Sequence, residues 1–274
     1  MTVPPALWLR LAALVVILNG TFPILWIFLT SLKSEAELTR RPITWLPADP
    51  TLANYLRAFA EQPLALFVLN SLIVAALATA LSILVAALAA YALARLKVRG
   101  RNLILGALVA VSTFPLITLM VPLFQIMRGL GLLNTYAALV LPYAVLNLPV
   151  CTLVLVSFFA SIPRDLENAA RLDGCTRLGA LWRIVMPLAA PGVFTAAILA
   201  FVNAWDEFLL ALSFMSSHEM RTVAVGITLY QGEYAFPWPL MSAALIVALV
   251  PIAVLIVAFQ EKVVSGLTQG GLNG

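Results

Sequence analysis

The chain has 274 residues, of which 63% are hydrophobic and only 10% are charged, and its mean hydropathy is +1.04. Soluble domains carry about 25% charged residues, so a soluble fold is excluded and the solvent of this chain is lipid. The formal net charge of +4 is too small and too dispersed to indicate a nucleic-acid partner, and in a membrane protein it mainly sets the orientation.

Six apolar stretches are long enough to cross a bilayer, which takes about 20 mostly apolar residues. They cover about 9–32, 66–94, 103–127, 136–160, 190–214 and 238–259. The sequence therefore predicts an all-α membrane protein with one transmembrane permease domain over residues 1–274. The first apolar run has 22 residues, more than the core of a cleavable signal peptide, so we expect it to remain as a span.

The charges in the loops predict the orientation. With both termini in the cytoplasm, the inner segments carry ten basic and four acidic residues, whereas the outer segments carry six of each. This excess satisfies the positive-inside rule. It predicts a multi-pass protein with outer loops at 33–65 and 215–237 and a long cytoplasmic loop at 161–189.

The cytoplasmic loop has the pattern of a short helix–turn–helix. Pro163 suits a helix start, acidic side chains follow in the first turn, and Gly174 suits a helix end. A second helix is expected over about 178–185, and Pro187 is expected to end it. That helix would have four apolar side chains on one face: Leu178, Leu181, Trp182 and Val185.

Two interpretations of this loop are open from the residues alone. It could be a connector that lies on the membrane surface. It could also be a docking element, because its small residues would let a partner approach the backbone and its charged rim would fix the register. The small residues are Ala169, Ala170, Gly174 and Cys175.

The loop also resembles a known signature. The pattern E-A-A, three residues, G, nine residues, I-x-L-P is typical of permease subunits of binding-protein-dependent ABC importers, and its spacing matches Ala169–Ala170, Gly174 and 184–187 here. Asn168 replaces the usual glutamate, and Met186 replaces a leucine of similar volume. The resemblance implies that the ionic part of docking falls to Glu167 or Asp173.

Further stretches resemble carbohydrate permeases of the maltose and trehalose type: 70–75, 130–143, 203–212 and 266–274. The resemblance implies a type I ABC importer permease in a bacterial inner membrane. Its partners would be a second homologous permease, two ATPase subunits and an extracytoplasmic substrate-binding protein. ATP and Mg would bind to the ATPase, and no cofactor would bind to this chain.

In that family the loop is the coupling helix, which sits in a cleft of the ATPase and moves with it. The resemblance therefore implies coupling through residues 164–186. The expected docking residues are Glu167, Asn168, Ala169, Ala170, Arg171, Asp173, Gly174 and Pro187.

Polar residues within the predicted spans suggest a solute path. Asn203, Asp206 and Glu207 would share one face of the fifth span, and ionisable groups at such depth usually face water or a polar partner. Carboxylates and amides accept hydrogen bonds from sugar hydroxyls, and Trp205 could stack on a sugar ring. The alternatives are an early end of the span in the headgroups, or a salt bridge to the partner permease.

The expected path residues are Asn203, Trp205, Asp206, Glu207, Asn147 and Gln125. Asn70 is expected to serve an interhelical hydrogen bond instead.

Two other classes of membrane protein remain as rivals. An ion-coupled secondary carrier is disfavoured because the chain has no internal repeat. A membrane enzyme would need a catalytic cluster, and the sequence has no metal-ligand spacing, nucleophile elbow or Gly-rich phosphate loop. The resemblance therefore implies a carbohydrate permease, the chain is predicted to be no enzyme, and the sequence does not identify the sugar.

Overall fold

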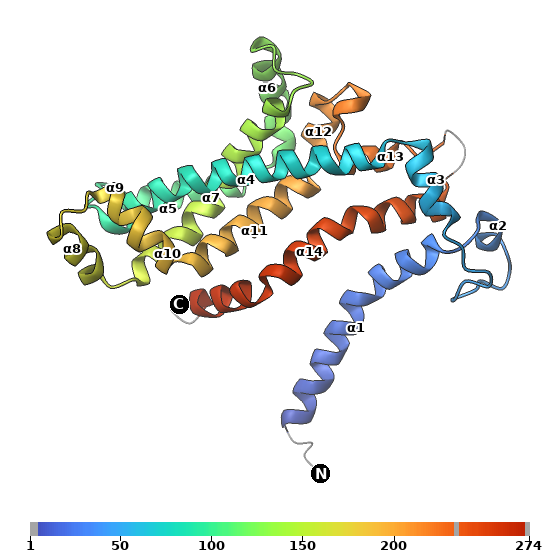
Figure 1. Ribbon diagram of the computed structural model, residues 1–274, viewed down its shortest axis with the longest axis horizontal. Coiled ribbons are helices and arrows are strands. Elements are labelled where there is room, and N and C mark those ends of the chain that lie inside the picture. Colours follow the sequence, from blue (N-terminus) through green and yellow to red (C-terminus); the bar gives the residue numbers. More distant parts are fainter. Residues whose placement is uncertain (1–4, 233–235, 272–274) are drawn as a thin grey trace. The chain divides into compact units, whose positions relative to one another are not determined.

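The computed structural model describes residues 5–232 and 236–271, with side chains described over 8–232 and 236–259. Over these residues the chain forms helices and no strand, which confirms the all-α class (Figure 1). Residues 233–235 of the predicted outer loop and 272–274 of the terminal segment lie outside the described residues. The chain divides into two compact units.

The first unit comprises residues 1–66 and 225–250. Its described helices are α1 (Pro5–Ser31), α2 (Glu35–Leu38), α3 (Ala53–Glu61), most of α13 (Val223–Thr228) and the first part of α14 (Trp238–Gly271), with the first turn of α4 (Leu64–Arg95) at its boundary. The buried Asn54 side chain in α3 donates hydrogen bonds of 2.8 Å to the carbonyl oxygens of Ser31 and Lys33. These bonds satisfy carbonyls that the end of α1 leaves without helical partners.

The second unit comprises residues 67–224 and 251–274. Its helices are α4 (Leu64–Arg95), α5 (Arg101–Ser112), α6 (Leu116–Gly129), α7 (Tyr136–Ser161), α8 (Arg164–Leu172), α9 (Arg177–Ala180), the π-helical turn η1 (Leu181–Val185), α10 (Met186–Leu188), α11 (Ala190–Asp206), α12 (Leu209–Phe214), the 3-10 turn η2 (His218–Met220) and the start of α13 (Val223–Thr228).

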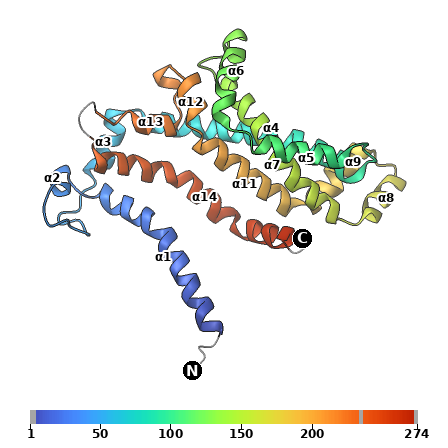
Figure 2. The same cartoon turned by 180° about the vertical axis from the view of Figure 1, so that it is seen from behind.

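Helix α7 is the centre of this second unit. It packs against α5 and α11, and both views show α4, α5, α7 and α11 side by side, with α8 and α9 at one end (Figures 1 and 2). Small residues let these helices approach closely, which is how helices associate in lipid. An alanine at Gly192 in α11, for example, would place its Cβ 2.2 Å from Cγ of Phe158 in α7.

Polar side chains also join the helices. The Ser82 hydroxyl of α4 donates a 3.2 Å hydrogen bond to the carbonyl oxygen of Ala144 in α7. The Asn70 side chain donates to the carbonyl oxygens of Glu219 and Arg221 at 2.8 and 2.9 Å, and it accepts from Tyr136. The structural role predicted for Asn70 is therefore confirmed.

Four helices are long and apolar enough to span a bilayer by themselves: Trp8–Ser31, Leu64–Arg95, Tyr136–Ser161 and Trp238–Phe259. They match the first, second, fourth and sixth predicted spans. The other two stretches are bent, so the described residues hold four such helices, or up to six if each bent pair is one span. The number of spans stays a prediction.

The third predicted span, 103–127, is not one straight helix. Helices α5 and α6 meet at an angle of 92°, and Pro115 holds the N-cap position directly before α6. Proline has no backbone N–H and clashes with the preceding turn, so the break falls where the sequence has its first proline in this stretch.

The fifth predicted span, 190–214, begins as expected, with Pro191 in the first turn of α11. It ends earlier than expected, because α11 stops at Asp206 and α12 is a separate helix. At its start, α11 is bent by 84° from the preceding helix, Arg177–Leu188.

Candidate functional site

The predicted helix–turn–helix in residues 161–189 is confirmed. Helix α8 ends in a turn in which Gly174 has a φ of +89°, a conformation that glycine adopts without steric cost. The N–H groups of Gly174 and Cys175 donate to the carbonyl oxygens of Arg171 and Ala170, at 3.1 and 2.9 Å. This is the Schellman pattern of helix ends. Thr176 then caps α9 by accepting a 3.0 Å hydrogen bond from the N–H of Gly179.

The second helix of this segment differs from its prediction in two ways. It continues to Leu188, beyond Pro187, through the π-helical turn η1. The four predicted apolar residues do not share a buried face, because Leu181 and Val185 are fully buried whereas Leu178 and Trp182 are 57% and 41% exposed. A π-helical turn changes the angular spacing of side chains, so a 3.6-residue period does not predict its faces.

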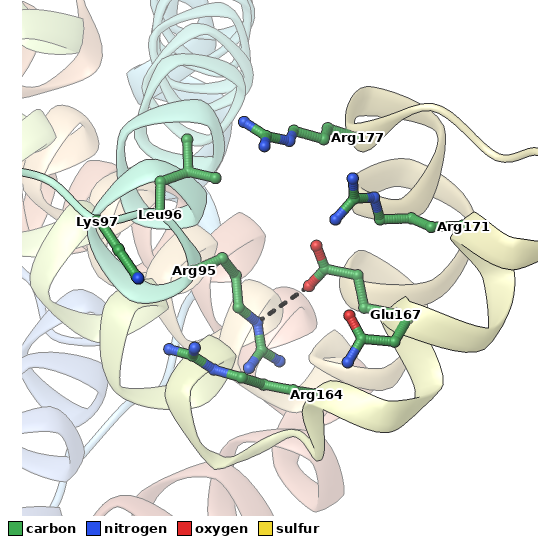
Figure 3. A pocket seen from close by; sticks show the side chains of 8 residues that line it. Arg95, Leu96, Lys97, Arg164, Glu167, Arg171 and Arg177 are labelled. Carbon is green, nitrogen blue, oxygen red and sulfur yellow. Dashed lines mark ion pairs between the residues drawn. The ribbon is translucent and has the colours of Figure 1, made fainter.

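Glu167 faces inward from α8. Its carboxylate lies 3.4 Å from Nε of Arg95 in α4 (Figure 3). It also accepts a hydrogen bond from the hydroxyl of Tyr91, one turn earlier in α4. The side chains of Arg95 and Glu167 are only 3% and 12% exposed. This carboxylate is therefore engaged within the chain, and the acidic side chain that points outward in the turn is Asp173.

Most of the other residues predicted to dock a partner lie on α8 and the turn after it, whereas Pro187 lies in α10. Asn168, Ala169, Arg171, Asp173, Gly174 and Pro187 are exposed, and Ala170 is half-buried. Leu172, which was not predicted from the sequence as a docking residue, is 89% exposed at the end of α8. An apolar residue directly before the Asp-Gly of a polar turn is the signal that could have found it.

A second feature is a cavity of about 280 Å³ beside the break between α5 and α6. Three of the predicted path residues line it together: Asn147, Asn203 and Glu207. The remaining lining residues are Val111, Ser112, Phe114, Leu116, Leu119, Tyr143, Val145, Leu146 and Ala204. The cavity therefore combines a mostly apolar wall with a few converging polar groups, which is the usual character of a small-molecule site.

Hydrogen bonds hold the polar groups of the cavity in place. The Asn203 amide donates to Oδ1 of Asn147 at 3.2 Å, and the Asn147 amide donates to the carbonyl oxygen of Tyr143 at 3.0 Å. The Glu207 carboxylate accepts from the N–H groups of Leu210 and Ala211, at 2.9 and 3.1 Å, and from the Tyr143 hydroxyl.

These contacts correct the expectation that Asn203, Asp206 and Glu207 share a helical face. The helix ends at Asp206, and Glu207 has an extended backbone (φ −68°, ψ 123°) because its side chain caps the N-terminus of α12. Asp206 is exposed and does not line the cavity.

The last two predicted path residues lie elsewhere. Trp205 is 3% exposed, and its ring stacks on Phe201 with centroids 5.8 Å apart, so the ring presents no free face to a sugar in this structure. Gln125 is exposed on α6 and does not line the cavity. Burial of Trp205 is a tertiary effect that its position in the sequence does not reveal.

Comparison with known proteins identifies the family to which this chain belongs. The family model for the inner membrane component of binding-protein-dependent transport systems matches residues 82–269, more than half of the chain. The chain belongs to this family. It is thus the membrane permease component of an ABC importer and not an enzyme, since ATP hydrolysis in this family resides on a separate subunit.

Curated members of the family match over nearly the whole chain. The sulfoquinovosyl glycerol transport system permease protein SmoH of Agrobacterium fabrum is 69% identical over 264 residues, which cover 96% of this chain and 93% of SmoH. The trehalose/maltose transport system permease protein MalG of Thermococcus litoralis is 37% identical and covers 97% of this chain and 96% of MalG. The resemblance to carbohydrate permeases is therefore confirmed, and no finding favours the ion-coupled carrier.

A solved structure supports the fold of this permease. A chain of a bacterial ABC transporter that imports the acidic polysaccharide alginate superposes with a TM-score of 0.80, at 22% sequence identity, and covers 95% of this chain and 99% of that chain. At this identity the likeness concerns the fold alone.

Proposed function

We propose that this permease forms half of the translocation pathway of an ATP-driven sugar importer, and that sulfoquinovosyl glycerol is its solute. The 69% identity to SmoH supports the choice of solute. A second permease would complete the pathway, an extracytoplasmic binding protein would deliver the solute, and two ATPase subunits with ATP and Mg would drive the cycle from the cytoplasmic side of a bacterial inner membrane.

The observation that carries the coupling role is the exposed tip of α8 and α9. Helix α8 is joined to α4 through Glu167, and the exposed surface at the end of α8 carries Leu172 and Asp173. A force on this tip would reach α4 directly, because the Glu167 carboxylate is paired with Arg95. The coupling segment is therefore residues 164–186, as the signature implies.

The cavity beside the break between α5 and α6 is the proposed solute contact within this chain. Asn147 and Asn203 offer amide groups, and Glu207 offers a carboxylate whose conformation is held by α12. Amide and carboxylate groups suit sugar hydroxyls, which both donate and accept hydrogen bonds. Asp206, Trp205 and Gln125 are left out of this contact because they do not line the cavity.

The test of coupling is reconstitution of the complete transporter in proteoliposomes with Leu172→Asn. We expect loss of ATP-dependent uptake and release of the ATPase on gel filtration, because a polar group would replace the exposed apolar tip. Leu46→Asn is the matched control, since Leu46 is also an exposed leucine, at 70%, in the segment between α2 and α3. Equal uptake by both variants and the wild type would contradict the coupling role.

The test of the solute contact is Asn203→Ala, compared with Asp206→Asn. We expect the KM for sulfoquinovosyl glycerol to rise with Asn203→Ala, because its amide lines the cavity, and to change little with Asp206→Asn. Competition with maltose and trehalose in the same assay tests the choice of solute. A larger effect at Asp206 would contradict this assignment of the path.

A further inference from the structure

A basic cavity of about 510 Å³ lies between the end of α4 and the start of the α8–α9 segment, all within the second unit (Figure 3). Five cationic side chains line it: Arg95, Lys97, Arg164, Arg171 and Arg177. Glu167 is the one carboxylate among its lining residues, which also include Leu96 and Asn168. The cavity thus carries an excess of four positive charges.

Most of this charge has no acidic partner, and Arg164 donates only a 3.4 Å hydrogen bond to the carbonyl oxygen of Ala94. Arg95 is paired with Glu167, and its guanidinium also donates a 2.9 Å hydrogen bond to the carbonyl oxygen of Ile162. Among the residues whose side chains are described, none of the other four cations forms an ion pair. Like charges gathered around one space repel one another, so an anion placed there would be strongly favoured.

The location of the cavity indicates where such an anion would come from. The apolar stretch of α4 ends at Arg95, and the cavity is lined by this residue and the two that follow it, Leu96 and Lys97. The end of a span is the level at which lipid headgroups lie, and basic pockets at this level bind anionic headgroups. Guanidinium groups suit phosphate because they donate two parallel hydrogen bonds to its oxygens.

We propose that this cavity binds the phosphate of an anionic phospholipid headgroup. The bound phosphate would offset part of the excess positive charge on α8, α9 and the end of α4, and would brace the α8–α9 segment against the end of α4. This site is separate from the solute cavity, so the proposal does not depend on which sugar is carried.

The probe is dioleoyl phosphatidylglycerol, with dioleoyl phosphatidylcholine as the neutral comparison. Lipid binding to the complete transporter, purified in detergent, is measured by native mass spectrometry at fixed salt. The cavity variant is Lys97→Gln with Arg177→Gln. The matched control is Arg99→Gln with Arg183→Gln, which removes the same charge from two exposed residues close by that do not line the cavity.

We expect the wild type to bind phosphatidylglycerol more tightly than phosphatidylcholine. The cavity variant should bind phosphatidylglycerol roughly 20-fold more weakly, because two cations near an anionic headgroup are lost. The control variant should retain most of the wild-type affinity. If the double cavity variant fails to assemble, Lys97→Gln alone is the second variant, since Lys97 is exposed.

Three results would overturn the proposal. Equal weakening by the cavity and control variants would mean that diffuse charge, and not this cavity, attracts the lipid. Displacement of phosphatidylglycerol by millimolar inorganic phosphate, with equal thermal protection, would make a soluble anion the ligand. Release of the ATPase by the cavity variant, with lipid binding unchanged, would mean that the cavity receives an acidic part of that partner.

Discussion

At the scale of single residues, the carboxylate of Glu167 links the cytoplasmic segment to a membrane helix. Two side chains of α4 hold it, the guanidinium of Arg95 at 3.4 Å and the hydroxyl of Tyr91. The neighbouring Asn168, which stands at the signature position usually held by glutamate, is exposed. The carboxylate one residue before the signature position is therefore used for an internal ion pair in this chain.

Glu167→Gln tests this link. The change leaves Arg95, whose side chain is 3% exposed, as a buried cation without its carboxylate, and we expect a loss of about 2 kcal/mol from the contact between α8 and α4. The measurements are the thermal midpoint of the purified transporter and the number of solute molecules imported per ATP. Asp165→Asn, at an exposed residue of the same helix, is the control, and an equal effect of both changes would contradict the link.

Gly192→Ala tests the close packing of α11 on α7. The new Cβ would lie 2.2 Å from the Phe158 ring, so the helices must separate, and overpacking of this kind costs about 1–3 kcal/mol. Gly106→Ala in α5 is the control, because no atom lies within 4 Å of its added Cβ. We expect the thermal midpoint to fall only for Gly192→Ala, and the fall should be smaller in a Phe158→Ala background, which lacks the Cγ and Cδ2 atoms that the new Cβ would meet. A neutral Gly192→Ala would show that the two helices do not meet here.

At the scale of elements, the sequence predicts helices well where local signals govern them. The α8 turn follows from Gly174, and the start of α11 follows from Pro191. The early end of α11 could not be predicted, because the Glu207 carboxylate leaves the helix to cap α12 and to bind Tyr143, 64 residues away in the chain. The pairing of Glu167 with Arg95 is likewise a tertiary contact, which no periodicity reveals.

The segment between α2 and α3 gives a prediction on pH. The pKa of Glu37 is lowered, first by the hydrogen bond from the Thr44 hydroxyl (2.6 Å) and then by the one from the Ala48 N–H (2.9 Å). A lowered folded-state pKa stabilises the fold above the ordinary value of 4.5, and this contribution is lost as the pH falls through the folded value. We expect amide exchange at Ala48, corrected for its intrinsic rate, to accelerate as the pH falls below 4.5 and through the folded-state pKa of Glu37.

The same loss of amide protection at Ala48 should occur at neutral pH in Glu37→Gln, because the carboxylate that accepts both hydrogen bonds is gone. Asp49→Asn, at an exposed acidic residue in the same segment, should leave the exchange of Ala48 unchanged. Protection of Ala48 that persists in acid would contradict this role of Glu37.

At the scale of the whole molecule, the predicted orientation can be tested with native cysteines. Cys175 lies partly exposed in the turn after α8, whereas Cys151 is fully buried in α7 and serves as a silent internal control. A membrane-impermeant maleimide should label Cys175 in inside-out vesicles and not in intact cells. Leu46→Cys, in the predicted outer loop, should show the reverse, and the opposite pattern at both positions would invert the orientation.

The central claim is that nucleotide hydrolysis outside this chain drives solute through it by way of the α8–α9 segment. The most direct measurement is accumulation of labelled sulfoquinovosyl glycerol in proteoliposomes, with the binding protein and the permease pair, with and without the ATPase and Mg-ATP. We predict accumulation only when the ATPase hydrolyses ATP. Accumulation by the permeases alone, driven by a proton or sodium gradient, would contradict the account.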